Sequence, residues 1–207
     1  MCSGPRASAG PDESFRSRHA VWAGVDVGGR RKGFHAALVD ESLVVAGPVR
    51  LRTADDVTEW LQPHSPSVVA VDSPRSPAED GNLSRACERR LARDVCGLRF
   101  TPDRDRLSGN PYYEWIVNGF GLYDVLARGA WVVVECFPTA SWTRWSGLRA
   151  GTRAEWSSRA LRTLGLGALP DRLSQDGRDA IAAAVTARLY AAGETDSYGE
   201  IVVPRAR

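Results

Sequence analysis

Three short apolar segments constrain the fold of this chain more than any other feature of its sequence. They are rich in β-branched residues and lie at residues 21–27 (VWAGVDV), 68–72 (VVAVD) and 131–135 (WVVVE). Segments of this length suit strands, and their near-continuous apolar character is typical of burial on both faces. Central strands of a parallel sheet have this character because helices cover both of their faces. The sequence therefore predicts an α/β fold.

The remaining segments complete a mixed sheet. Residues 33–40 and 43–51, joined by the polar turn at residues 40–42, are predicted to extend the first strand into an antiparallel meander. Capping and stop residues predict four helices. The first follows Thr53 and runs to Leu61, and the second follows Ser84 and covers residues 85–95. The third begins at Asn110-Pro111 and runs to residue 128, and the last covers residues 176–191. The order β-β-β-α-β-α-α-β-α-α predicts a mixed five-stranded sheet flanked by helices, with a helical insertion between the fourth and fifth strands. Residues 200–203 are a candidate for a short final strand.

The organisation of the chain favours one domain. After the first residues there is no internal repeat and no Gly/Ser-rich linker, so we expect a single domain over residues 20–207. Residues 1–19 are polar, which predicts a disordered tail and no secretory signal. No apolar run approaches the roughly 20 residues that cross a bilayer. We therefore expect a cytoplasmic protein that has reduced cysteines and no membrane contact, and its oligomeric state stays open.

Composition narrows the classes of function. Lys and Arg number 27 against 25 Asp and Glu, a formal net charge of +2, so total charge gives no argument for nucleic-acid binding. The four cysteines form no CxxC pair and the three histidines are scattered, so we expect no zinc site of thiolate or imidazole ligands. The chain also lacks the motifs of P-loop NTPases, zincins and serine hydrolases.

Acidic residues stand where the predicted strands end. Asp26, Asp72 and Glu135 each lie at or near the carboxyl end of one apolar segment, the edge at which open α/β sheets bind ligands. Asp176 and Asp179 open the last predicted helix, three residues apart, and so share one of its faces. Carboxylates brought together repel one another unless a cation lies between them. The pattern favours a site for Mg²⁺ or Mn²⁺, the ions that prefer such oxygen ligands.

Each acid also has a structural interpretation. Asp72 precedes Ser-Pro and could form an Asx turn, Asp176 could be a helix N-cap, and Asp179 could interact with the helix dipole. Taken together, three strand ends and one helix start favour a binding site over these separate roles. Two ions in such a site stabilise the attacking and leaving oxygens of phosphodiester hydrolysis.

Five phrases of the sequence resemble one known family. In chain order they are GVDVGGRRKGF, VVAVDSP, WVVVECFPTASW, DGRDAIAAAVTAR and GEIVVP, within residues 20–204. They resemble the predicted RNase H-like nucleases called domain of unknown function 429. The segment RACERRLARDVCGLRFTP is similar to that family's Arg/Glu helix and the hydrophobic-Thr-Pro segment after it. The resemblance implies an RNase H-like fold, related to RNase H, Holliday-junction resolvases and integrases.

The resemblance also implies roles for the five acids. Asp26 matches the first-strand acid, Asp72 the central-strand acid and Asp179 the helix acid, which together hold two Mg²⁺ ions in the related nucleases. Glu135 and Asp176 match auxiliary ligands. The last motif begins Asp-Gly-Arg, which is an unusual start for a helix. This departure concerns the roles that the resemblance implies for Asp176 and Asp179. The catalytic prediction is Asp26, Asp72, Glu135 and Asp179, with Asp176 as a further metal ligand.

Two arginine-rich segments are candidates for nucleic-acid contact. Residues 85–106 hold seven arginines against four acids, and residues 142–162 hold five arginines against one acid, interleaved with three tryptophans. Arginines mixed with aromatic residues suit phosphate contacts and base stacking. The alternative is a solvated helix face with its tryptophans turned into the core.

Three functions stay open from the sequence. The first is a Mg²⁺- or Mn²⁺-dependent nuclease acting on DNA or RNA. The second is a phosphotransferase or ATPase of the actin-like fold, because VDVGG resembles the first phosphate loop of that superfamily. It lacks a clear second phosphate loop and an adenosine motif. The third is a non-catalytic RNase H-like binding module.

Overall fold

The computed structural model describes residues 20–206 and arranges them around a seven-stranded sheet. The strand order is β3-β2-β1-β4-β5-β7-β6. The strands are β1 (Trp22–Val27), β2 (Phe34–Val39), β3 (Val44–Leu51), β4 (Val68–Asp72), β5 (Val132–Cys136), β6 (Thr195–Tyr198) and β7 (Ile201–Pro204). The predicted mixed α/β architecture is confirmed for this part of the chain. The disordered tail expected at residues 1–19 lies outside the described residues.

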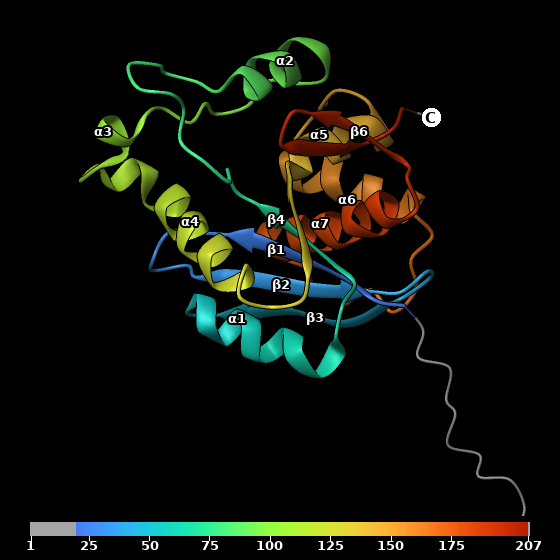
Figure 1. Ribbon diagram of the computed structural model, residues 1–207. Coiled ribbons are helices and arrows are strands. Elements are labelled where there is room, and N and C mark those ends of the chain that lie inside the picture. The colour runs from blue at the N-terminus through green and yellow to red at the C-terminus, as the bar shows by residue number, and fades with distance from the viewer. Residues whose placement is uncertain (1–19, 207) are drawn as a thin grey trace, which may run out of the picture.

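The three apolar segments form the centre of the sheet, as predicted. β1 pairs in parallel with β4, and β4 pairs in parallel with β5. β2 and β3 continue from β1 as an antiparallel meander. The residues of β1 and β4 are mostly buried, because helices cover both faces of the sheet at these strands (Figure 1).

The prediction of five strands was wrong, because two further strands lie beyond β5. β7 is the candidate final strand and pairs in parallel with β5, and β6 pairs with β7 in antiparallel fashion. β6 has the sequence Thr-Asp-Ser-Tyr, of which Tyr198 alone is buried. An edge strand can be polar because its backbone pairing holds it in place, and polar residues there discourage pairing with other chains. Such a strand carries no apolar periodicity for sequence analysis to detect.

Seven α-helices lie in the described part of the chain. They are α1 (Ala54–Leu61), α2 (Ala86–Asp94), α3 (Arg104–Leu107), α4 (Glu114–Leu126), α5 (Pro138–Ser146), α6 (Arg153–Thr163) and α7 (Gln175–Ala191). α2, α3 and α4 form the helical insertion predicted between the fourth and fifth strands. Three helices follow β5 where the predicted order had two, because Gly147 ends α5 and Thr152 caps α6. The N-cap of α2 is Arg85, one residue after the predicted Ser84. The N-cap of α7 is Ser174. None of these helices is long and apolar enough to cross a membrane.

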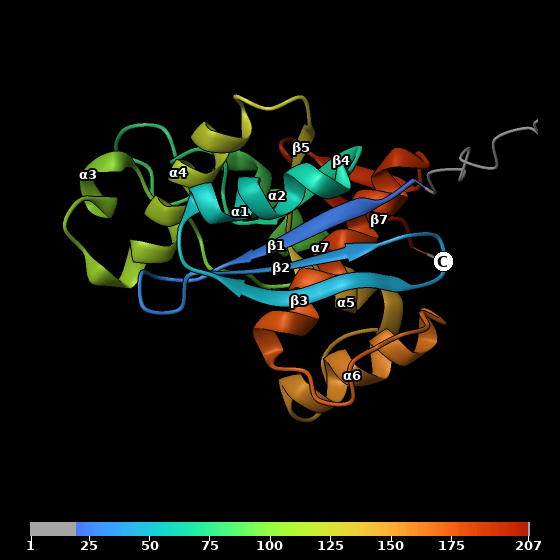
Figure 2. The same ribbon diagram turned by 90° about the horizontal axis from the view of Figure 1, so that it is seen from below.

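Different helices cover the two faces of the sheet (Figures 1 and 2). α1 and α4 pack on the face that carries Val25 and Val27 of β1. α7 packs on the opposite face, which carries Trp22 and Gly24, and α5 and α6 pack against α7. Because side chains alternate along a strand, Asp26 lies on the face that α7 covers.

Gly24 allows α7 to approach β1 closely. A Cβ atom at this position would lie 2.0 Å from the backbone nitrogen of Ala184, so no larger residue fits between the strand and the helix. The alanine-rich face of α7 provides the matching smooth surface. Asp26 follows Gly24 by two residues and therefore faces the N-terminal turns of α7, which carry Asp176 and Asp179.

Candidate metal centre

Asp26 and Asp72 lie side by side at the carboxyl ends of two parallel strands. They are partners in the register of β1 and β4, so their side chains leave the sheet on the same face. Their carboxyl groups are hydrogen-bonded to each other. Burial, and then the charges of neighbouring carboxylates, raise the pKa of Asp26 well above its ordinary value and that of Asp72 to about 8. Within residues 20–206, neither carboxylate forms an ion pair with Lys or Arg.

Asp179 approaches this pair from α7 and is held by three side chains. Its Oδ1 accepts a hydrogen bond from Nε1 of Trp142 at 2.8 Å, and its Oδ2 forms an ion pair with Arg153 at 2.9 Å. The amide nitrogen of Gln175, one turn earlier on α7, donates to both oxygens at 3.0 and 3.1 Å. Burial raises the pKa of Asp179, and these three partners oppose that effect. The charge of Asp179 in turn contributes to the raised pKa of Asp72.

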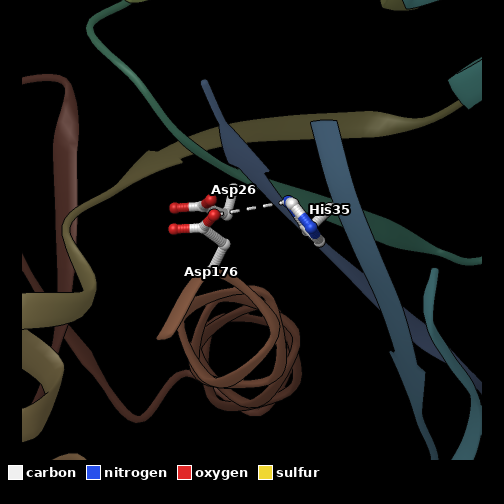
Figure 3. A group of neighbouring side chains, drawn as sticks. All are labelled: Asp26, His35 and Asp176. Carbon is white, nitrogen blue, oxygen red and sulfur yellow. Dashed lines mark ion pairs between the residues drawn. The ribbon is translucent and has the colours of Figure 1, made fainter. Parts of the chain in front are cut away.

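Asp176, also on α7, lies next to two basic residues of the β1–β2 hairpin. The ammonium of Lys32 lies 3.1 Å from each of its carboxylate oxygens, and Nδ1 of His35 lies 3.9 Å from Oδ2. Figure 3 shows the carboxylates of Asp26 and Asp176 next to each other, with the imidazole of His35 beside them on β2. One ligand atom from each of these three side chains lies within 4.8 Å of the other two. Burial lowers the pKa of His35, although the charge of Asp176 opposes this effect.

Glu135 lies near the group but leaves its strand on the other face. It is the register partner of Val71, so the residue of β5 on the face of Asp72 is Cys136. The carboxylate of Glu135 is occupied by Arg85, whose Nη1 donates to Oε2 at 2.8 Å and whose Nη2 pairs with Oε1. The backbone nitrogen of Arg75 also donates to Oε2, at 2.8 Å. Glu135 is therefore held by an ion pair, with its two oxygens already hydrogen-bonded.

A cavity of about 940 Å³ brings all five predicted acids together. Its lining includes Asp26, Asp72, Glu135, Asp176 and Asp179. Basic side chains from distant segments line the same cavity: Lys32, Arg85, Arg99, Arg149 and Arg153. The arginines come from both arginine-rich segments of the sequence, so each segment contributes to the walls of the cavity that holds the acids.

The tryptophans of the second arginine-rich segment follow the alternative interpretation. Trp142 and Trp156 are fully buried, and Trp145 packs against the same core. Trp142 and Trp156 are therefore not available for base stacking. Trp142 instead has a role in the site, because it donates a hydrogen bond to Asp179.

Sequence reasoning missed several residues that surround the acids. Arg153 and Trp142 appeared only as members of a basic segment, and their contact with Asp179 depends on how α5 and α6 pack on α7. His35 has no predicted role, because the three histidines are scattered along the sequence. A signal for it existed, because the register of the predicted hairpin places His35 opposite Asp26.

The chemistry of this arrangement is that of a cation site. Four carboxylates from β1, β4 and α7 converge, and two of them, Asp26 and Asp72, share a hydrogen bond in place of a cationic partner. Carboxylate oxygens are the ligands preferred by Mg²⁺ and Mn²⁺, and such an ion would relieve the repulsion that raises these pKa values. The residues present therefore fit a divalent cation.

No protein-family model matches the chain, and no curated protein matches it. Among solved structures, the chain is similar to the RuvC structure from Thermus thermophilus, with a TM-score of 0.48 and 19% sequence identity. The likeness covers 89% of this chain and 99% of that chain. The resemblance to the family called domain of unknown function 429 thus rests on the sequence motifs alone.

Proposed function

We propose that this chain is a divalent-metal-dependent nuclease that hydrolyses phosphodiester bonds of DNA or RNA. The observation that carries the proposal is the paired carboxyl groups of Asp26 and Asp72, which have no Lys or Arg ion-pair partner in the described residues. Asp176 and Asp179 complete the set of residues that would hold Mg²⁺ or Mn²⁺. The order of β1 to β5, with α7 across the first strands, supports an RNase H-like domain over residues 20–207.

The chain's own residues would position the reaction. When bound, a divalent ion supplies Lewis-acid stabilisation of the charge that develops on phosphoryl oxygens during hydrolysis. Asp26 and Asp72 give two adjacent oxygen ligands on rigid central strands. Trp142 and Gln175 fix the orientation of Asp179 through hydrogen bonds. Glu135 orders the wall of the cavity through Arg85 and the backbone of residue 75, which supports a positioning role for it and leaves four carboxylates as metal ligands.

Charges around the acids support a polyanionic substrate. Lys32, Arg99, Arg149 and Arg153 line the same cavity, so a phosphate chain that reaches the acids passes several cations. Nε of Arg153 is buried and has no hydrogen-bond partner among residues 20–206, and the same holds for Nε1 of Trp115, another residue of the lining. Buried donors without partners are uncommon, and phosphate oxygens are suitable acceptors for them.

The hairpin after β1 disfavours the actin-like alternative. In that superfamily the backbone amides of the first phosphate loop bind phosphate. Here the amides of Gly28 and Gly33 donate to Gly33 and Gly29 carbonyls at 2.8 and 2.9 Å, and the amide of Lys32 donates to Gly29 at 2.8 Å. The amide of Arg30 donates to the carboxylate of Glu114 at 3.0 Å. Four of the six backbone amides of residues 28–33 are therefore already hydrogen-bonded, three of them within the turn, which supports a nuclease over a phosphotransferase.

The test is a set of cleavage assays with matched variants. Labelled single-stranded, duplex and branched DNA and RNA are incubated with the protein in Mg²⁺ and then in Mn²⁺, and ATP hydrolysis is measured in parallel. We expect metal-dependent cleavage of at least one nucleic acid, lost in Asp26→Asn and in Asp179→Asn. Asp124→Asn is the control, since it makes the same change of charge at an exposed site on α4. ATP turnover without cleavage would favour the actin-like alternative, and no activity in any assay would favour the binding module.

A further inference from the structure

We propose that His35 supplies an imidazole ligand to an ion shared with Asp26 and Asp176, so that this position selects Mn²⁺ or another first-row transition ion over Mg²⁺. The inference rests on the proposed function, because it assigns the metal preference of the same centre. It also goes beyond the sequence analysis, where the scattered histidines predict no zinc site of imidazole ligands.

Three separate elements bring the three ligands together. Asp26 on β1 and His35 on β2 are direct partners in an antiparallel pair, so their side chains leave the sheet on the same face. Asp176 reaches them from the first turn of α7 (Figure 3). Their nearest ligand atoms lie within 4.8 Å of one another. Two atoms on opposite sides of one ion lie about 4.2 to 4.6 Å apart at ordinary bond lengths, so small side-chain movements are sufficient.

The surroundings of His35 leave its ring available. In the described part of the chain no hydrogen bond to its imidazole is formed, and its ion-pair neighbour is Asp176, 3.9 Å from Nδ1. A histidine with a structural role usually donates or accepts a hydrogen bond that fixes its ring. Arg50 and Lys32 are the cationic groups near the ring, and neither offers it an acceptor. The ring therefore faces the acids without an established structural partner.

A second observation shows that the carboxylate of Asp176 attracts a cation. The ammonium of Lys32 lies 3.1 Å from both carboxylate oxygens of Asp176. The Lys32 side chain is 63% exposed, so it can leave Asp176 at little cost when another cation binds. An exposed lysine on the carboxylate is thus compatible with an ion at the position between Asp176, Asp26 and His35.

The ligand set determines which ion is preferred. Mg²⁺ binds oxygen ligands and keeps several waters, whereas imidazole suits first-row transition ions. Mn²⁺ accepts both carboxylate and imidazole ligands, and its unpaired electrons make it a direct probe. An ion held by two carboxylates and one imidazole therefore favours Mn²⁺, whereas carboxylates alone, as at Asp72 and Asp179, give no such preference.

The direct test is electron paramagnetic resonance of Mn²⁺ bound to the full chain. We expect pulsed measurements to show modulation from a coordinated ¹⁴N nucleus, which changes to the ¹⁵N pattern when the protein is made with ¹⁵N-histidine. This comparison needs no substitution and so does not depend on the folding of a variant. His35→Gln should remove the nitrogen signal and weaken Mn²⁺ binding by roughly tenfold or more, with Mg²⁺ binding changed much less. His64→Gln, at an exposed histidine after α1, should change neither.

The outcomes separate this inference from the proposed function. Mn²⁺ that binds through Asp26 but shows no nitrogen modulation would overturn the role of His35 and leave the nuclease proposal intact. Equal weakening of Mn²⁺ and Mg²⁺ binding in His35→Gln would also overturn the selectivity. If neither ion binds, or if Asp26→Asn leaves binding unchanged, the metal centre of the proposed function is itself wrong.

Discussion

The indole nitrogen of Trp142 donates a 2.8 Å hydrogen bond to Oδ1 of Asp179, and this bond links the core of the protein to the candidate metal centre. Trp142 is fully buried on α5, between α6 and α7. Its packing fixes the indole, and the indole fixes the carboxylate. The orientation of Asp179, a proposed metal ligand, thus depends on a residue outside the lining of the cavity.

Trp142→Phe should therefore weaken metal binding while keeping the fold. Phenylalanine fills most of the same volume but has no donor for Oδ1 of Asp179. Loss of a partner that orients a metal ligand typically weakens metal affinity by about 10- to 100-fold. Isothermal titration with Mn²⁺ measures the change. Trp145→Phe is the control, because no side-chain hydrogen bond of Trp145 holds a carboxylate in the described residues, and equal affinity in both variants would contradict the role given to Trp142.

The Asp26–Asp72 pair should make stability depend on pH when metal is absent. The pKa of Asp72 is about 8 in the folded chain against an ordinary value of 3.8, so the folded state binds this proton more tightly than the unfolded state. The stabilisation is complete below about pH 4 and is lost as the pH rises through about 8. Between these values the free energy of unfolding of Asp72→Asn should rise relative to the wild type, by at most about 1.4 kcal/mol per pH unit.

Urea unfolding in a chelating buffer, repeated from about pH 5 to about pH 9, measures this difference. This range includes the raised pKa of Asp72, about 8. Asp124→Asn should keep a constant difference from the wild type, since that side chain is exposed on α4. A constant difference for Asp72→Asn as well would show that the Asp26–Asp72 pair does not share a tightly held proton.

Arg85 should be more important for stability than for metal binding. Its side chain is 6% exposed and pairs with the side chains of Glu135 and Glu88, which are 3% and 1% exposed. Arg85→Met would leave these carboxylates buried without their cation, which costs about 3 to 5 kcal/mol when one partner of a buried pair is removed. Arg89→Met, on the exposed side of the same helix, should cost less than about 0.5 kcal/mol.

Denaturant unfolding of the two arginine variants gives these free energies, and Mn²⁺ titration of Glu135→Gln completes the comparison. We expect Glu135→Gln to keep metal affinity within about threefold of the wild type, the usual scatter in the effect of a single interaction on binding. A loss as large as that in Asp26→Asn would instead make Glu135 a metal ligand.

Gly24→Ala should disturb the fold and the centre together. The added Cβ would lie 2.0 Å from the backbone nitrogen of Ala184, so α7 must move away from β1. Overpacking of this kind costs about 1 to 3 kcal/mol or more, and the shift would separate Asp176 and Asp179 from Asp26. Gly121→Ala is the matched control on α4, where an added Cβ meets no atom of residues 20–206 within 4 Å beyond the nearby backbone of its own helix, and it should stabilise the chain by up to about 1 kcal/mol.

Thermal and denaturant unfolding give both stabilities, and Mn²⁺ titration reports on the centre. Weaker binding in Gly24→Ala with normal binding in Gly121→Ala is the expected pair of results. Unchanged metal affinity in a destabilised Gly24→Ala variant would show that the centre does not depend on the close packing of α7.

The sequence by itself determined the central layer of this protein and the positions of the acids along it. Continuous apolar segments have to be buried on both faces, which predicts parallel strands, and β1, β4 and β5 pair in that way. Asp26 and Asp72 end two such segments and were therefore predictable as neighbours. Asp179 was predictable as a helix residue near them through the resemblance of its motif.

Local patterns did not determine the polar edge of the sheet or the direction of each side chain. β6 has no apolar period, because backbone pairing with β7 holds it in place. Glu135 also ends an apolar segment, but the face from which it leaves depends on the register between β4 and β5. A one-residue difference in register moves a side chain to the other face, and tertiary packing sets the register.

Only the tertiary structure decided which groups surround the acids. Lys32 and His35 reach Asp176 across the sheet, and Arg153 and Trp142 reach Asp179 from α6 and α5. These partners are separated from the acids by between 26 and 144 positions in the sequence. Sequence patterns report local periodicity and local caps, whereas contacts over such separations arise when helices and strands pack together.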